Sequence, residues 1–203
     1  MKRNSMTLYV GNDIYSQRLH ITLAEKAITA DIIQVNENNV DASLLEISPD
    51  GKLPLLIDRD LVLDIASVMT EYLDERFPHP PLLPVYPVAR AKSRLLIGKI
   101  EQTWFPLMEA LLEEESDEKL NELMNQILQL TPLLEDNTFF LSSEFSLVDC
   151  AVAPILWRLQ QMGVNFSQYS KLLQAYADNV FARDSFQASL SEQEVYSELT
   201  DDI

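Results

Sequence analysis

The hydrophobic pattern in the first part of the chain alternates between short apolar runs and a stretch with helical spacing. Apolar runs predict strands at residues 7–10 and 30–35, and the intervening residues 14–24 place apolar side chains on one helical face. A strand, a helix and a second strand within about thirty residues are typical of a βαβ unit. We therefore expect two parallel strands joined by a right-handed crossover.

The following residues predict a β-hairpin and another helix. A weakly patterned helix is expected at 41–46, and the apolar runs 55–57 and 61–63 flank a polar turn. Helical spacing returns at 66–77. The order βαβ, short helix, ββα is the thioredoxin-like plan, which carries a cis-proline at the entry to its third strand. Pro54 stands at this point, and a proline would otherwise be unusual in a strand.

Residues 89–190 predict helices only. Their apolar residues follow helical spacing over two long stretches and again after Ser146, and two shorter helical segments follow. Ser146 and Asp149 have the spacing of a capping box, in which a serine caps the helix and an acidic residue three positions later reaches back to it. We assign this pair a structural role at a helix start rather than a catalytic one.

A proline-rich segment separates the two patterns. Half of the ten prolines lie between Phe77 and Pro87. Because proline lacks an N–H and restricts the residue before it, we expect an extended segment, serving either as a packed linker or as a docking surface. The predicted organisation is a thioredoxin-like domain, a proline-rich linker, an all-helical domain and an acidic tail, at 6–78, 79–88, 89–190 and 191–203.

Composition narrows the class of protein. An apolar share of 47% in 203 residues suffices for a core, no apolar run reaches membrane-spanning length, and the N-terminus lacks the apolar stretch of a signal peptide. The single cysteine, Cys150, excludes an internal disulfide and a Cys-x-x-Cys site. We therefore expect a cytoplasmic protein that binds no membrane.

Charge argues against nucleic acid as a direct partner. The net charge is −17, with 15 basic against 32 acidic residues, so phosphate backbones should be repelled. Four of the basic residues nevertheless follow the proline-rich segment, where they could orient an encounter with a protein partner; they are Arg90, Lys92, Arg94 and Lys99.

A thioredoxin-like domain, a proline-rich linker and an all-helical domain with a Ser-x-x-Asp cap together resemble the glutathione transferase superfamily. Five local sequences resemble one branch of it, the RNA polymerase-associated stringent starvation protein A family. They are Leu23–Lys26, Glu71–Leu82, Pro84–Arg90, Phe145–Cys150 and Arg183–Phe186. The resemblance implies an α+β two-domain glutathione transferase-like fold. Its N-terminal domain would be thioredoxin-like, with a mixed four-stranded sheet and helices, and its C-terminal domain an all-α bundle.

The same resemblance implies a function. It predicts a transcription regulator that binds RNA polymerase holoenzyme in starvation or stress, through protein contact, with no catalysis, metal or cofactor. Pro78, His79 and Pro80 would form a surface pocket for this contact, with Tyr86 beside it, which favours docking over a linker role alone. Superfamily members pair through their third and fourth helices, so we expect a homodimer or a dimer with a paralogue.

The alternative is a glutathione-dependent transferase or peroxidase. Such enzymes place Ser, Cys or Tyr at the start of the first helix to stabilise the glutathione thiolate, where this chain has Asp13. They also use an acidic residue followed by Ser at the start of the third helix, where this chain has Ile65 and Ala66. An enzyme would therefore need Tyr15 or Ser16 in place of the usual nucleophile. We expect that the protein has no such enzymatic activity.

Overall fold

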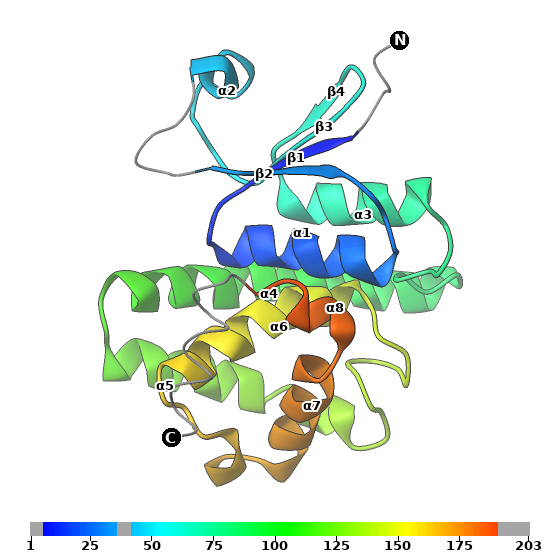
Figure 1. Cartoon of the computed structure of the whole chain (residues 1–203). Coiled ribbons are helices and arrows are strands. Elements are labelled where there is room, and N and C mark those ends of the chain that lie inside the picture. Colours follow the sequence, from blue (N-terminus) through cyan, green and yellow to red (C-terminus); the bar gives the residue numbers. More distant parts are fainter. Residues whose placement is uncertain (1–5, 36–41, 191–203) are drawn as a thin grey trace. The chain divides into compact units, whose positions relative to one another are not determined.

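The computed structural model describes residues 6–35 and 42–190, which fall into two compact units (Figure 1). The first unit contains the described residues up to Pro80 and those from Asp184 onward, and the second runs from Pro81 to Arg183. One unit carries a sheet with helices and the other is helical. The predicted α+β two-domain architecture is confirmed.

A four-stranded mixed sheet forms the centre of the first unit, in the order β2-β1-β3-β4. β1 pairs with β2 in parallel and with β3 antiparallel, and β3 and β4 form the expected hairpin. The pattern of short apolar runs therefore predicted the strands correctly. Their bounds are Thr7–Val10 for β1, Asp31–Gln34 for β2, Leu55–Asp58 for β3 and Leu61–Leu63 for β4.

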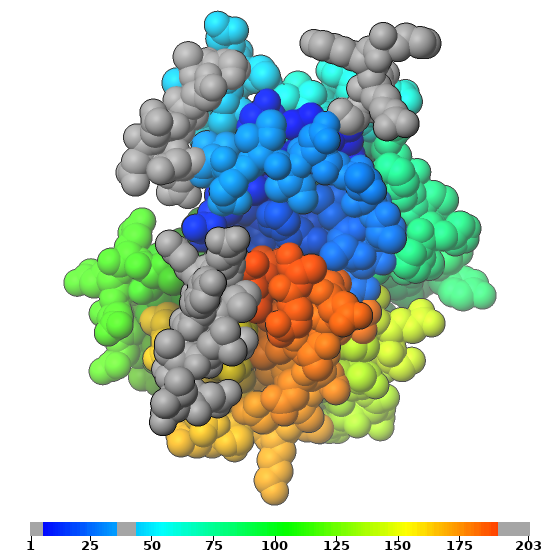
Figure 2. Space-filling model, viewed as in Figure 1, coloured from blue at the N-terminus to red at the C-terminus, as the bar shows by residue number. Residues whose placement is uncertain are grey.

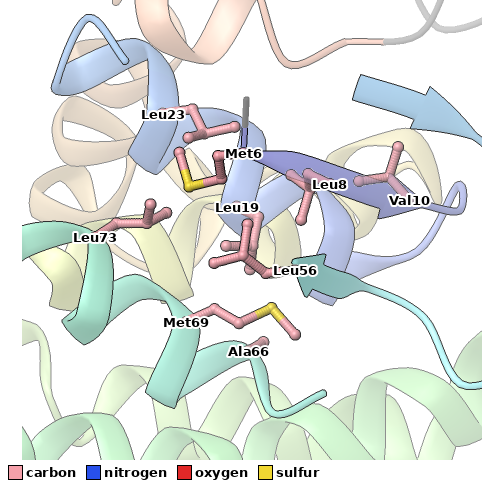
Figure 3. Packing of buried hydrophobic residues seen from close by; sticks show 9 residues of the cluster. All are labelled: Met6, Leu8, Val10, Leu19, Leu23, Leu56, Ala66, Met69 and Leu73. Carbon is pink, nitrogen blue, oxygen red and sulfur yellow. The ribbon is translucent and has the colours of Figure 1, made fainter. Parts of the chain in front are cut away.

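The core of the first unit lies between the sheet and two helices, α1 (Ile14–Glu25) and α3 (Ala66–Arg76). Leu8 and Val10 alternate with exposed or half-buried neighbours, so one face of β1 enters the core. Figure 3 shows these side chains meeting apolar residues of both helices and of β3. The cluster consists of Met6, Leu8, Val10, Leu19, Leu23, Leu56, Ala66, Met69 and Leu73.

The outer strand β2 exposes all four of its residues, and Figure 2 shows this light-blue segment at the surface of the first unit. Two further helices belong to this unit, α2 (Ala42–Ile47) and α8 (Asp184–Gln187). α8 packs against α1, where the Ser185 hydroxyl hydrogen-bonds the Glu25 carboxylate. The predicted boundaries place α8 in the helical domain, whereas α8 belongs to the first unit through its contacts with α1. The domain boundaries stay a prediction.

The second unit is a bundle around α6 (Leu147–Gln161), which packs against α4 and α7. Nearly every residue of α6 is buried, including Trp157. The helices α4, α5 and α7 span Pro87–Glu113, Asp117–Leu128 and Lys171–Phe181, and the 3₁₀ helices η1 and η2 span Thr131–Leu134 and Phe166–Gln168. Among the described helices, none is long and apolar enough to cross a membrane.

A capping box begins α6. Ser146 is its N-cap and accepts a hydrogen bond from the Val148 N–H at 3.2 Å, while the Ser146 N–H donates to Asp149 Oδ2 at 2.8 Å. The other oxygen of Asp149 accepts from the Phe140 N–H at 3.1 Å and from the Tyr176 hydroxyl at 2.8 Å. One carboxylate thus joins the loop before α6, the start of α6 and the middle of α7.

Burial controls the titration of this carboxylate. Loss of solvation raises the pKa of Asp149 from 3.8 to about 6, although its hydrogen bonds act in the opposite direction. Burial, followed by the nearby Asp149 charge, also raises the pKa of Tyr176 well above its usual value. The second unit therefore contains a buried carboxyl group that is expected to take up a proton near pH 6.

We predict that Ser146→Ala lowers the free energy of unfolding by about 2 kcal/mol, because both the helix cap and a hydrogen bond to a buried carboxylate are lost. Ser116→Ala is the matched control, since Ser116 caps α5 through a single 3.4 Å bond from Lys119 N–H. Its expected cost is about 0.5 kcal/mol. Urea denaturation of both variants measures the difference, and equal losses would contradict the special role of Ser146.

We also predict that the stability of the second unit depends on pH through Asp149. Its pKa is about 6 in the folded state and 3.8 in the unfolded chain, so the folded state binds the proton more tightly. The contribution of this group to stability is therefore fully present below pH 4 and is lost as pH rises through about 6.

The measurement compares wild type with Asp149→Asn, which does not titrate. Wild type should gain about 1.4 kcal/mol relative to the variant between pH 7.5 and pH 5, a range above the isoelectric point near 4.3. Urea denaturation at both pH values gives this difference. A wild-type-to-variant difference that stays constant with pH would refute the assignment.

Candidate partner-binding site

The proline turn, residues Pro78, His79 and Pro80, lies exposed after the end of α3. Just before it, Phe77 is half-buried and packs against the apolar core of the first unit. The Arg76 guanidinium lies over the Phe77 ring, 5.6 Å from its centroid, and its Nε is 2.9 Å from Asp58 Oδ2. The turn therefore leaves α3 from an anchored position.

Asp58 also fixes the preceding turn of α3. The Tyr72 hydroxyl donates to Asp58 Oδ2 at 2.6 Å, and the pKa of Tyr72 is raised, first by desolvation and then by this contact. Asp58 ends strand β3 and is buried. The sheet and the C-terminal part of α3 are thus tied together next to the proline turn.

A buried lysine reaches the turn from α1. Lys26, the C-cap residue of α1, places its Nζ 2.7 Å from Asp74 Oδ1 and donates to the Pro80 carbonyl at 2.5 Å. The Lys26 side chain has no solvent exposure. Nothing in the sequence pattern marked Lys26 or Asp74 as part of this site.

Tyr86 belongs to the second unit, where it is the N-cap residue of α4 and is 79% exposed. Its neighbours Val85 and Val88 are each 71% exposed. Arg90 Nε donates to the Pro84 carbonyl at 2.9 Å and holds the chain just before Tyr86. The sequence predicted Tyr86 as a contact residue but not the apolar surface on either side of it.

Asp13, where the resemblance expects the nucleophile of a transferase, is the N-cap residue of α1. Asp13 Oδ1 accepts hydrogen bonds from the N–H groups of Tyr15 and Ser16, both at 2.8 Å. The Ser16 hydroxyl donates to Asp13 Oδ2 at 2.6 Å and accepts from the Gly11 N–H at 2.9 Å. Ser16 is fully buried, and Tyr15 packs against the core. A carboxylate therefore already occupies the positive end of the α1 dipole.

The resemblance expects a second glutathione-binding position at the start of α3. Ile65 is the N-cap residue of α3, with its side chain 57% exposed and no side-chain cap, and Ala66 is buried. Two hydrocarbon side chains therefore stand where the resemblance expects an acid and a serine.

Two peptide bonds that precede a proline are cis in the described residues. One joins Leu53 to Pro54 at the entry to β3, and the other joins His79 to Pro80 in the proline turn.

Comparisons with known proteins agree with this fold. The family described as the N-terminal domain of glutathione S-transferase matches residues 14–81, and the family described as its C-terminal domain matches residues 96–184. Glutathione transferase Omega 3C from Trametes versicolor has a similar structure, with a TM-score of 0.83 at 26% identity, covering 98% of this chain and 92% of that one. The fold and the two family matches show a glutathione S-transferase-like protein.

Closer relatives identify the branch. A stringent starvation protein A homolog of Pasteurella multocida is 49% identical over 93% of this chain and 92% of its own length. The homolog of Coxiella burnetii is 46% identical over 96% of this chain and 95% of its own length. The chain belongs to the stringent starvation protein A family.

Proposed function

We propose that this protein is a cytoplasmic regulator that binds RNA polymerase holoenzyme and alters transcription in starvation or stress, through protein contact and without catalysis. The name of the curated relatives, at 44–49% identity, supports a stress-response role. The structural observation behind the contact is the proline turn, which is exposed while its Pro80 carbonyl accepts a hydrogen bond from the buried Lys26.

Rigid exposed groups make good contact residues. Proline has a fixed φ angle, so the turn loses little conformational entropy when a partner binds. His79 adds a polar ring to an otherwise apolar surface. Tyr86 in the second unit adds a 79% exposed ring with a hydroxyl group. Tyrosine is frequent among the residues that contribute most of the binding energy of a protein interface.

The charge distribution supports a protein partner over nucleic acid. The chain carries a net charge of −17, whereas Lys92 and Lys99 are exposed on α4 close to Tyr86 in sequence. A local basic region on an acidic protein can orient the encounter with an acidic protein surface. We propose no direct contact with nucleic acid or membrane.

A dimer is part of the proposal. Exposed apolar side chains occur on α3, with Ile65 at its start and Val68 47% exposed, and on α4, where Leu95 is 75% exposed. Apolar faces of this kind on helices favour a symmetric partner, either a second copy or a paralogue. Sedimentation of the purified chain as a 23.2 kDa monomer would contradict the homodimer.

The competing function is a glutathione-dependent transferase or peroxidase. The Asp13 carboxylate takes the N–H groups that would stabilise a thiolate, and the hydroxyl of Ser16 is engaged on both sides. A second negative charge at this helix end would be repelled rather than stabilised. We therefore favour protein contact over thiol chemistry.

We predict that the wild-type protein is not retained on immobilised glutathione. The Trametes Omega transferase serves as the positive control. Asp13→Ser is the informative variant, because serine can still cap α1 while the negative charge is removed. It should stay folded, and any retention on glutathione that it gains over wild type measures how strongly the Asp13 charge opposes the ligand. Retention of the wild-type chain, together with turnover of a thiol substrate, would contradict this prediction and would favour the enzymatic function.

We predict that Pro78→Ala/His79→Ala/Pro80→Ala abolishes capture of RNA polymerase holoenzyme by the otherwise wild-type protein. Tyr86→Ala should weaken capture, whereas Tyr169→Ala, which removes a 46% exposed tyrosine elsewhere in the second unit, should leave it unchanged. A pull-down with purified holoenzyme gives the result, and circular dichroism checks folding. Full capture by the triple variant would refute the assigned contact.

A further inference from the structure

Lys26 and Asp74 form a buried ion pair that contacts the backbone of the proline turn. The Lys26 ammonium lies 2.7 Å from the Asp74 carboxylate and donates to the Pro80 carbonyl at 2.5 Å. We propose that Lys26, neutralised by Asp74, is a positioning residue that holds the proline turn in its binding conformation. This inference rests on the proposed function.

The turn cannot hold itself through backbone hydrogen bonds. Of residues 78–81, Pro78, Pro80 and Pro81 lack an N–H, which leaves His79 as the single backbone donor of the four. A turn normally closes through an N–H of its own backbone. The Pro80 carbonyl instead receives its hydrogen bond from a side chain 54 residues earlier in the chain. A donor from another element therefore holds a segment in which three of the four residues have no backbone N–H.

Lysine suits this task because its ammonium group has three donors and no acceptor. One donor is used by Asp74 and a second by the Pro80 carbonyl. Burying an unpaired ammonium is costly, so the group is stable here only with a carboxylate beside it. Asp74 is 8% exposed and lies on α3. The pair therefore joins α1, α3 and the turn at one point.

Three anchors follow one another along this part of the chain. The Phe77 N–H donates to the Leu73 carbonyl at 3.0 Å and ends α3, and the Pro80 carbonyl is held by Lys26. In the second unit, the Leu82 carbonyl accepts from the Leu147 N–H at 2.9 Å. Between the first and third anchors, the Lys26 contact fixes the residues that face the partner. Without it, the next described anchor on the C-terminal side of Pro78 and His79 would be Leu82.

Lys26 cannot itself be a contact residue, since its side chain is fully buried. Its effect on binding is therefore expected to act through the population of the competent turn. If that population falls to about a tenth, the apparent affinity for the partner falls about tenfold. The surface chemistry of the turn remains unchanged.

The test uses Lys26→Met/Asp74→Asn, which removes both charges and so leaves no unpaired charge in the core. Arg18→Met is the matched control, because Arg18 is a fully buried base on the same helix whose Nη2 lies 3.5 Å from Thr70 Oγ1, away from the turn. The double variant should bind RNA polymerase holoenzyme about tenfold more weakly, and the control should bind like wild type. Lys26→Arg, which keeps a charged donor, should recover most of the affinity.

A second readout needs no partner. In ¹H–¹⁵N spectra of the free protein, the signal of the His79 amide should shift in the double variant and keep its wild-type position in Arg18→Met. An unchanged His79 amide, or wild-type binding by the double variant, would overturn the positioning role. If the triple variant of the turn also binds holoenzyme normally, the assigned contact at the turn fails, and the His79 amide still decides whether Lys26 holds the turn. If wild type binds no holoenzyme, the proposed function itself fails.

Discussion

Burial of ionisable side chains is the constraint on which both units depend. A charge away from water must be matched by hydrogen-bond donors or by an opposite charge, so the elements around it have little freedom. In the second unit, Asp149 receives donors from the loop before α6, from the start of α6 and from α7. In the first unit, Lys26 and Asp74 impose the same requirement on α1, α3 and the proline turn.

Local patterns were enough to predict the elements and the fold class. Apolar alternation marked β1, helical spacing marked α1 and α3, and the polar turn after residue 57 marked the hairpin. These signals are local because periodicity reflects which face of one element is buried. The partners of buried charges are different. Tyr176 lies 27 residues from Asp149, and Asp74 lies 48 residues from Lys26, so no spacing rule connects them.

At the candidate site, too, some features could be predicted from local sequence and others could not. Proline restricts the backbone wherever it occurs, so the segment around Pro78 could be recognised from composition alone. The apolar surface of α4 could not, because an apolar residue in a helix is expected to face the core. Leu95 is 75% exposed and its neighbour Leu96 is 8% exposed, although the two residues are chemically identical. Helical spacing assigned Leu96 to the buried face with Ile100 and Trp104, but it did not show how much of the rest of α4 the bundle leaves exposed.

Asp13 caps the first helix with a carboxylate of the chain itself, so this cap does not depend on a bound ligand. Its carboxylate belongs to the chain and satisfies two N–H groups at the start of α1 in every molecule. This cap is part of the chain and is present at every ligand concentration. The start of α1 therefore needs no bound molecule to satisfy these two N–H groups.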